Sequence, residues 1–480
     1  MEKWTALLLA CLLQVGAQAG PVNPTSYVAF VNEYRSRGST YANIADYNII
    51  IQSVTGNPFQ GDLIVFPEGT LTGNDTSVPV PNPEDKIVPY KDEFYKKFAP
   101  LEAISRSAAT FKAYVVVNLN ERLECEEGDI CPPRGYFKYN TNVVFDREGT
   151  VIARYRKFNV CQGFDVDRPE TAELSTFTTD FGVTFGLFTG FDIFFKAPAL
   201  DLIREKNIRN VVYPSRWRAE LPFLTSVQVQ SGFSYALDIN LLAAGVNDID
   251  NGSTGTGIYL GRSGRANFNS DLEGSLLIYK RLPGGDNAEK TSFAISTDTD
   301  MALDRLKYSE DPTIASASGK DLDMKAESFE EEICYGDRCC RFSAKYRPSG
   351  LGNAEKYSYR AVVFEGERSV GPNTRMNAAY CAIVLCTDGN CARRPPNGKF
   401  PLIFDEINIE GNFPTENTFQ MPSTLAYQNC DSISFFNVME YDRFSFERVE
   451  DSESGTSKAS ISLKKPGAGD LMTFGIFGRF

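Results

Sequence analysis

The chain shows two different sequence patterns, which meet between residues 311 and 332. Before this segment, from about Ser26 to Lys307, short β-branched or aromatic runs alternate with stretches whose apolar residues have helical spacing. After it, aromatic and polar residues alternate, which is typical of half-buried strands. A chain of 480 residues also exceeds what one hydrophobic core usually organises. We therefore expect two domains, at 20–310 and 333–480, joined by a polar linker at 311–332.

The first domain is expected to be a layered α/β structure. Predicted helices cover residues 42–53, 90–111, 198–206 and 223–242, and predicted strands cover residues 63–66, 113–119, 143–145, 151–155, 183–188 and 210–213. The sequence Asp146-Arg147-Glu148-Gly149 predicts a hairpin turn between two of these strands. Strands and helices mixed in this order favour sheets that are covered by helices.

The second domain is expected to be smaller, mostly β and held together by disulfides. Its predicted strands include residues 357–364, 380–386, 432–438 and 471–480. Seven of the eleven cysteines lie in this part of the chain. Disulfides stabilise a small β domain whose own hydrophobic core is limited.

The first 19 residues have the pattern of a secretory signal peptide. Lys3 precedes a mostly apolar stretch at 6–15, and Ala17-Gln18-Ala19 is a small-residue cleavage site. The apolar stretch is shorter than the roughly 20 residues that span a bilayer. The C-terminus lacks the hydrophobic tail of a lipid-anchor signal. We expect a secreted, extracellular protein without a membrane anchor.

In an oxidising compartment, disulfides are the expected state of the cysteines. All cysteines except Cys11 are predicted to be disulfide-bonded: Cys125, Cys131, Cys161, Cys334, Cys339, Cys340, Cys381, Cys386, Cys391 and Cys430. The short acidic loop between Cys125 and Cys131 predicts a local disulfide. The vicinal Cys339 and Cys340 are expected to have separate partners. Two acceptor sequons for N-glycosylation begin at Asn74 and Asn251.

Histidine is absent, which excludes several kinds of site. No Ser-His-Asp or Cys-His catalytic group can form, and histidine cannot bind zinc, copper or haem. The usual side-chain titration between pH 5 and 8 is also missing. We expect neither a metal nor another cofactor. The formal net charge of -13 argues against nucleic acid as a partner, because phosphate backbones attract clustered lysine and arginine. The oligomeric state stays open.

Three short segments contain the residue types of an amide-hydrolysing site. An apolar run ends in a carboxylate, a lysine closes a hairpin, and a small-residue turn follows a strand; the segments are Asp62-Leu63-Ile64-Val65-Phe66-Pro67-Glu68, Arg154-Tyr155-Arg156-Lys157-Phe158-Asn159 and Gly186-Leu187-Phe188-Thr189-Gly190-Phe191-Asp192. In this order and spacing they resemble the Glu-Lys-Cys triad of the nitrilase superfamily, most closely its vanin and biotinidase branch. Residues 334–340 and 381–391 also resemble the C-terminal domain of vanins. The resemblance implies an αββα sandwich followed by a β domain.

The resemblance also implies a role for each position. Glu68 would be the general base, Lys157 would stabilise the oxyanion, and the backbone N–H of Phe191 would be the second oxyanion donor. The family carries its nucleophilic cysteine where this sequence has Gly190, and glycine has no side chain to attack a carbonyl. Loss of the nucleophile from a cooperating set costs on the order of a millionfold in rate. Glu68 and Lys157 are therefore expected to be vestigial.

A displaced nucleophile is the alternative, and Cys161 is the candidate for it. It follows Lys157 in the chain, where vanins usually carry no nucleophile. A triad tolerates only small displacements of the attacking atom. We therefore favour a structural disulfide for Cys161, with Cys430 or another C-terminal cysteine as its partner.

Three functions compete. The favoured one is a catalytically inactive, secreted pseudoenzyme with a binding or other non-catalytic role. The second is an active amidase that hydrolyses pantetheine- or biotin-type amides, and the third is an extracellular storage or structural protein. Phenylalanines crowd the segment around Gly190, and most of them are expected in the core: Phe177, Phe181, Phe185, Phe188, Phe191, Phe194 and Phe195. A small amphipathic or planar ligand could occupy a pocket beside them, with Lys157 holding its carboxylate.

Overall fold

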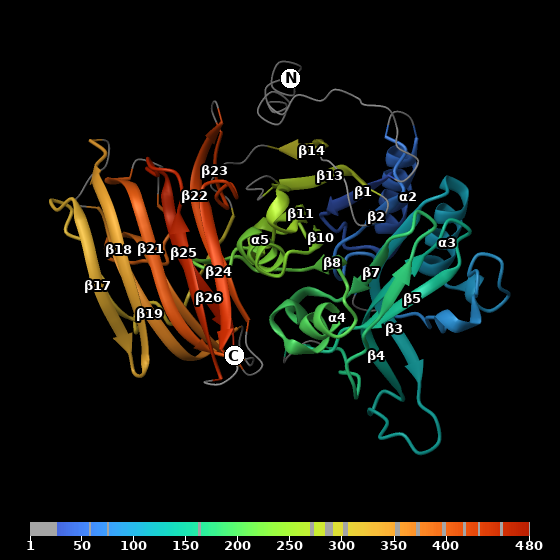
Figure 1. Cartoon of the computed structure of the whole chain (residues 1–480). Helices are drawn as coiled ribbons and strands as arrows, with labels where there is room; N and C mark the ends of the chain where they lie inside the picture. Colours follow the sequence, from blue (N-terminus) through green and yellow to red (C-terminus); the bar gives the residue numbers. More distant parts are fainter. Residues whose placement is uncertain are drawn as a thin grey trace.

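The first domain consists of two β-sheets packed face to face, with helices on both outer sides (Figure 1). In the computed structural model, the described residues are 26–56, 59–73, 76–161, 165–268, 273–283, 291–300, 306–350, 356–370, 375–395, 400–415, 419–430, 433–451 and 455–479. The first sheet contains, in spatial order, β14 (Thr291–Asp300), β13 (Glu273–Pro283), β1 (Ser26–Glu33), β2 (Leu63–Val65), β3 (Tyr114–Glu124), β4 (Tyr136–Phe145) and β5 (Val151–Arg156). The second contains β12 (Arg265–Phe268), β11 (Thr256–Leu260), β10 (Asn240–Gly245), β8 (Asn210–Ser215), β7 (Thr184–Leu187) and β6 (Thr176–Thr178).

Burial on both faces explains why these strands are almost continuously apolar. On β1, Ala29 and Val31 face the core shared with the second sheet, whereas Val28 and Phe30 face a separate core under the helices. That outer core is covered by α2 (Thr40–Thr55) and α3 (Ala99–Phe111). The second sheet is flanked by α4 (Asp201–Arg204) and α5 (Ser226–Leu237) (Figure 1). The expected αββα sandwich is confirmed.

Two predicted helices were too long. The predicted helix 90–111 begins only at Ala99, because Pro100 suits the first turn of a helix and the preceding residues form turns and the short helix η2 (Tyr95–Lys97). The predicted helix 223–242 combines α5 with the start of β10. Thr225 caps the beginning of α5, and Asp238 ends it in a left-handed conformation at φ 52°.

Other local predictions agree with the structure more closely. Residues 198–206 form a helical segment in two parts, η4 (Lys196–Leu200) and α4. The turn at 146–149 joins the antiparallel strands β4 and β5. Gly149 in this turn has φ 78°, a left-handed conformation that favours glycine. No helix within the described residues is long and apolar enough to cross a membrane.

The second domain is a sandwich of two antiparallel sheets. One contains β16 (Ser318–Asp321), β19 (Tyr357–Ser369), β20 (Arg375–Thr387), β26 (Leu471–Arg479), β22 (Phe419–Cys430) and β23 (Ile433–Asn437). The other contains β17 (Ser328–Tyr335), β18 (Arg338–Pro348), β21 (Leu402–Pro414), β25 (Thr456–Leu463) and β24 (Phe444–Asp451). The expected sheet-rich, disulfide-containing domain is confirmed.

The segment expected to be a linker belongs to this sandwich. Residues 311–332 contain β16 and most of β17, which pair with β19 and β18. The acidic run Glu330-Glu331-Glu332 occupies an edge strand with one side toward solvent, so its polarity reflects an exposed edge. Before it, β15 (Ser309–Glu310) pairs with β9 (Glu220–Leu221) of the first domain.

Four disulfides lie among the described residues. Cys125–Cys131 closes the loop between β3 and β4, as predicted, and the neighbouring cysteines have separate partners in Cys334–Cys339 and Cys340–Cys381. Cys340–Cys381 joins the two sheets of the second domain, and Cys386–Cys391 closes the end of β20. Gly411 leaves room for this inter-sheet bridge, because an added Cβ would lie 3.0 Å from the Cys381 sulfur.

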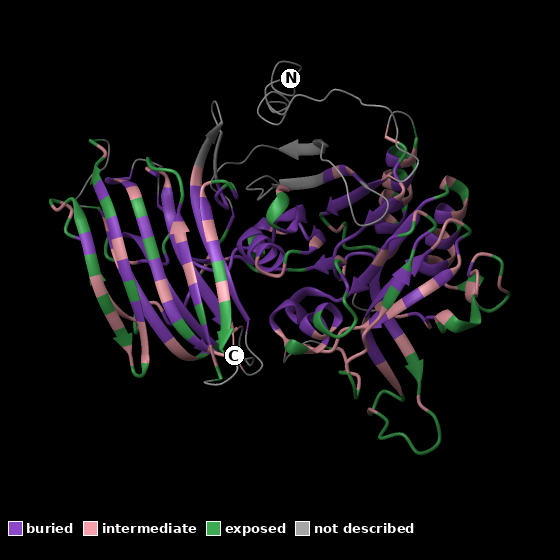
Figure 2. Cartoon of the chain, viewed as in Figure 1, coloured by how far each residue is buried: buried purple, intermediate pink, exposed green. Residues whose placement is uncertain are grey.

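Helix α5 connects the two domains by packing. Residues 226–235 are all buried, and Figure 2 shows the helix enclosed between the second sheet and the C-terminal sandwich. Gly232 permits the close approach, since a Cβ there would lie 2.6 Å from Pro422 O on β22. Polar contacts accompany this packing, with Ser231 Oγ and Tyr441 Oη separated by 2.9 Å.

Candidate active site

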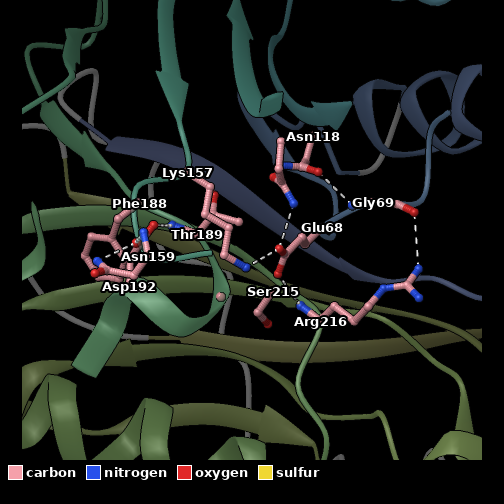
Figure 3. A network of polar contacts seen from close by, with 12 residues as sticks. Glu68, Gly69, Asn118, Lys157, Asn159, Phe188, Thr189, Asp192, Ser215 and Arg216 are labelled. Carbon is pink, nitrogen blue, oxygen red and sulfur yellow. Dashed lines mark hydrogen bonds and ion pairs between the residues drawn. The ribbon is translucent and has the colours of Figure 1, made fainter. Parts of the chain in front are cut away.

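Four segments that each follow a strand meet at one end of the αββα sandwich (Figure 3). Glu68 follows β2, Lys157 follows β5, Gly190 follows β7 and Arg216 follows β8. The carboxyl ends of parallel strands lie at one edge of a sheet, where ligand sites of α/β folds usually form. The structure therefore brings together Glu68, Lys157 and Gly190, the three side-chain positions that the sequence singled out.

Glu68 is the centre of the polar contacts, although only 5% of it is exposed. Its Oε1 accepts hydrogen bonds from Lys157 Nζ at 2.5 Å and from Asn140 Nδ2 at 2.9 Å. Its Oε2 accepts from the backbone N of Arg216 at 2.9 Å. A buried carboxylate is costly unless it is paired and hydrogen-bonded, and these donors satisfy both oxygens.

Lys157 is held in its charged form. Burial disfavours the ammonium group, but the carboxylates of Glu68 and Asp192 outweigh burial and raise the pKa of Lys157 above its ordinary value. Its charge is thus balanced within the protein by Glu68.

Gly190 begins the short helix η3 (Gly190–Phe194) with φ 51°, a left-handed conformation. Tyr213 Oη donates a hydrogen bond to Gly190 O at 2.7 Å and so fixes the turn. A Cβ added at Gly190 would lie 2.9 Å from Lys157 Nζ and 3.2 Å from Glu68 Cδ, and it would clash with Glu68 Oε2. A side chain at this position would therefore point directly between Glu68 and Lys157.

The carboxylate of Asp192 links the turn at Gly190 to the segment that carries Lys157. Its fully buried carboxylate accepts hydrogen bonds from Tyr155 Oη at 2.7 Å and from Asn159 N at 2.8 Å on one side, and from Thr189 N at 3.2 Å on the other. Burial raises the pKa of Asp192, and Lys157 together with these donors opposes that rise. Asp192 positions the site without facing the space between Glu68 and Lys157.

Phe191 is buried and packs beside aromatic neighbours, with ring-centroid distances of 5.7 Å to Phe194 and 5.3 Å to Phe195. Most phenylalanines of this segment lie in the core, as expected. The role of the Phe191 N–H as an oxyanion donor stays a prediction.

The remaining predicted residues have mixed outcomes. Cys161 is half-buried and lies near Lys157. Its disulfide stays a prediction, as does that of Cys430, whose side chain lies outside the described ones. Asn251 is exposed, and its Nδ2 donates to Asp248 at 2.9 Å. Asn74 lies outside the described residues. Glycosylation at both asparagines stays a prediction.

The sequence reasoning missed an asparagine cluster beside Glu68. Asn118 Nδ2 donates to Asn140 Oδ1 at 2.6 Å and to Asn142 Oδ1 at 2.9 Å, and Asn118 Oδ1 accepts from Gly69 N at 2.7 Å. The sequence does contain a sign of this cluster. Asparagine is uncommon in strands, yet it occurs here at alternate positions of two neighbouring strands. Arg216 and Tyr213 were missed as well, and no local pattern marks them.

Two protein-family models match this chain, one in each of its two domains. The carbon-nitrogen hydrolase model matches residues 34–221, and the vanin C-terminal domain model matches residues 306–480. Vanin-like protein 2 of Drosophila melanogaster is 34% identical over 99% of this chain and 93% of its own length. A human pantetheinase is 28% identical over 90% of this chain and 82% of its own length. The biotinidase of Takifugu rubripes is 30% identical over 87% and 84% of the two chains.

Proposed function

The chain belongs to the vanin-like branch of the carbon-nitrogen hydrolases, and we propose that it is a secreted member that uses its site for binding without hydrolysing amides. Relatives named pantetheinase and biotinidase act on amides, so a hydrolase is the natural comparison. The proposed difference is a missing nucleophile in an otherwise retained site.

Gly190 is the observation that supports this proposal. A side chain at this position would project between Glu68 and Lys157, which is where a nucleophile must stand to be deprotonated by one and assisted by the other. Glycine supplies no attacking atom. Without one, a cooperating catalytic set loses on the order of a millionfold in rate.

Water is a poor substitute for the missing thiol in this geometry. Glu68 Oε2 already lies where the first side-chain atom of residue 190 would be. A water molecule at that point would crowd the carboxylate, whose Oε2 is held by a hydrogen bond from the backbone N of Arg216 at 2.9 Å. Lys157 is also less available to an oxyanion, because Glu68 neutralises it.

Export is the other part of the proposal. The pattern of residues 1–19 is that of a signal peptide, and the described disulfides fit an oxidising compartment. Detection of the processed chain in the culture medium of expressing animal cells, starting near Gly20, tests this part. Retention of an unprocessed chain inside the cells would contradict it.

Hydrolysis of pantetheine, measured as release of the thiol cysteamine, tests the catalytic part. We expect no turnover by the native protein. In Gly190→Cys we expect measurable turnover, because the thiol would stand between base and lysine, although strain at φ 51° and the displaced carboxylate should keep it well below that of an active relative.

Gly190→Ala is the matched control, since it adds the same Cβ and the same strain without a thiol. Turnover in the cysteine variant but not in the alanine variant assigns the activity to the sulfur. Turnover by the native protein would overturn the proposal and favour the active amidase. In that case loss of activity in Cys161→Ala would identify Cys161 as the nucleophile.

A further inference from the structure

The last residue of β8 and the segment after it have the sequence Ser215-Arg216-Trp217-Arg218 and an alternating burial pattern. Ser215 and Trp217 are buried, with 8% of Trp217 exposed, whereas Arg216 and Arg218 are both exposed. Alternate residues of an extended segment point to the same side, so both guanidinium groups face solvent. Arg216 lies next to Glu68 (Figure 3), and Arg218 follows two residues later on the same side of the chain.

Neither arginine forms an ion pair within the described part of the chain. Arg216 Nη2 donates a hydrogen bond to the carbonyl of Gly69 at 3.2 Å, and this neutral contact leaves its charge uncompensated. By contrast, the partly buried Arg156 pairs with Glu121, and the buried Arg368 pairs with Asp311. In a protein with a formal net charge of -13, two uncompensated cations beside a site create a local attraction for anions.

The backbone that carries these arginines is fixed. The N–H of Arg216 is bound to Glu68, and Trp217 Nε1 donates to Leu224 O at 2.9 Å. The Trp217 ring packs against Phe194 with centroids 5.4 Å apart. A ligand would thus meet two guanidinium groups whose attachment points are already ordered, which lowers the entropic cost of binding.

From this arrangement we propose that Arg216 and Arg218 bind the carboxylate or phosphate group of a small organic anion at the mouth of the site formed by Glu68, Lys157 and Gly190. The inference rests on the proposed function, because it names the ligand class of the same site. Lys157 is already neutralised by Glu68, so an acidic ligand group finds its positive charge in the arginines.

The chemistry of arginine fits this ligand class. A guanidinium group binds carboxylate or phosphate oxygens through two parallel hydrogen bonds, which gives both strength and orientation. The contact of Arg216 with Gly69 O uses one of its donors and leaves others for a ligand. A nucleic acid is disfavoured, because two isolated arginines on an acidic protein cannot follow a phosphate backbone.

Trp217 supplies a built-in reporter of binding. The chain contains two tryptophans, and the other, Trp4, lies in the expected signal peptide. Titration of the secreted protein with pantothenate, followed by Trp217 fluorescence and by calorimetry, tests the proposal. Panthenol, which replaces the carboxylate of pantothenate by a neutral alcohol, is the matched ligand control, and inorganic phosphate separates a phosphate preference from a carboxylate preference.

We expect pantothenate or phosphate to bind at least tenfold more tightly than panthenol, with weaker binding at high salt. Arg216→Ala and Arg218→Ala should each weaken that binding about tenfold or more, since each removes charge-assisted hydrogen bonds. Arg209→Ala is the matched protein control, because Arg209 is exposed and lies at the opposite end of β8. Its binding should equal that of the native protein.

Three results would overturn the inference: equal affinity for pantothenate and panthenol, no binding of either anion, or unchanged binding in both arginine variants. Hydrolysis of pantetheine is measured on the same samples. The proposed loss of catalysis and the proposed anion binding can then be refuted independently of each other. Turnover by the native protein would refute the proposed loss of catalysis, but the inference about the arginine site would still stand. Absence of anion binding with absence of turnover would refute only the arginine site.

Discussion

Glu68 has a structural role that its hydrogen bonds make visible. Its carboxylate connects the segment after β2 with β4 through Asn140, with the end of β5 through Lys157 and with the end of β8 through Arg216. These contacts give the pair of Glu68 and Lys157 a structural reason to be present that does not depend on hydrolysis. The pair thus contributes to the architecture of the site.

Removal of this carboxylate should destabilise the protein strongly. Glu68→Ala leaves Lys157 buried without its anion, and we expect the free energy of unfolding to fall by about 3–5 kcal/mol. Urea denaturation followed by circular dichroism measures the change. The double variant Glu68→Met with Lys157→Met is the control, since removing both charges should cost much less. A loss below about 0.5 kcal/mol in Glu68→Ala, the usual scale for an uninvolved surface residue, would show that the pair is not structural.

Glu33 is a second buried carboxylate, and it lies at the end of β1. It accepts hydrogen bonds from Asn247 Nδ2 at 2.8 Å, from Thr254 Oγ1 at 2.8 Å and from Gly255 N at 3.0 Å. Burial raises the pKa of Glu33 to about 7, and the hydrogen bonds oppose this rise. A chain without histidine therefore still contains a group that titrates near neutral pH.

Stability should depend on pH through Glu33. Its carboxyl group has a pKa of 4.5 in the unfolded chain and about 7 in the folded chain, so folding favours the protonated form. Its contribution is fully present below pH 4.5 and is lost as the pH rises toward 7, at about 1.4 kcal/mol per pH unit. We expect the stability difference between the native protein and Glu33→Gln to change by about 3 kcal/mol across this range. Denaturation curves at several pH values measure it, and parallel pH profiles for the two proteins would contradict it.

At the scale of elements, α5 carries the contact between the domains. The first ten residues of this helix are all buried, including the polar residues Ser226, Gln230 and Ser234, so no solvent-exposed face marks its limits. Gly232 stands where the helix meets β22, and the contact is closer than any side chain allows. The position of this glycine is therefore set by the neighbouring domain and not by the helix.

Gly232→Ala should reverse the usual effect of this substitution. Alanine normally stabilises a helix interior by about 0.5–1 kcal/mol relative to glycine. Here its Cβ would meet Pro422 O at 2.6 Å and Met421 Sδ at 3.0 Å, so we expect a loss of about 1–3 kcal/mol from overpacking. Thermal unfolding measures it. Gly56→Ala is the control, because its Cβ would meet only Gln52 O at 3.6 Å. A gain in stability for Gly232→Ala would show that the domains are not in close contact there.

At the scale of the whole molecule, a buried ion network joins the domains. Arg368 on β19 is completely buried and pairs with Asp311 at 3.0 Å and with Glu220 on β9. Burial raises the pKa of Glu220 to about 7, while Arg368 opposes this rise. The network connects β9 of the first domain with β19 of the second domain and with Asp311, which follows β15.

Arg368→Met should destabilise the contact between the two domains. The substitution leaves two buried carboxylates without their cation, for which we expect a loss of about 3–5 kcal/mol. We also expect unfolding monitored by Trp217, which reports on the first domain, to separate from unfolding monitored by circular dichroism. Arg375→Ala on the neighbouring strand is the control, because its ion pair is exposed and should contribute less than about 1 kcal/mol. Coincident curves and an unchanged midpoint in Arg368→Met would refute the role of the network.

The sequence by itself determined the classes of the two domains and their order along the chain. Alternating patterns predict an α/β domain followed by a β domain. Three short segments point to Glu68, Lys157 and Gly190 through their resemblance to the Glu-Lys-Cys triad of the nitrilase superfamily. Strand periodicity and local turn chemistry act over a few residues, so they are readable along the chain. The local disulfide Cys125–Cys131 is predictable for the same reason.

Only the tertiary structure decided how these parts act on one another. The limits of α5, the assignment of residues 311–332 to edge strands, and the pairing of Cys340 with Cys381 all depend on contacts between distant segments. The same holds at the site, where Lys157 proves to be neutralised and Arg216 lies beside Glu68, 148 residues away in sequence. Burial and charge compensation are properties of the packed chain, and no local pattern contains them.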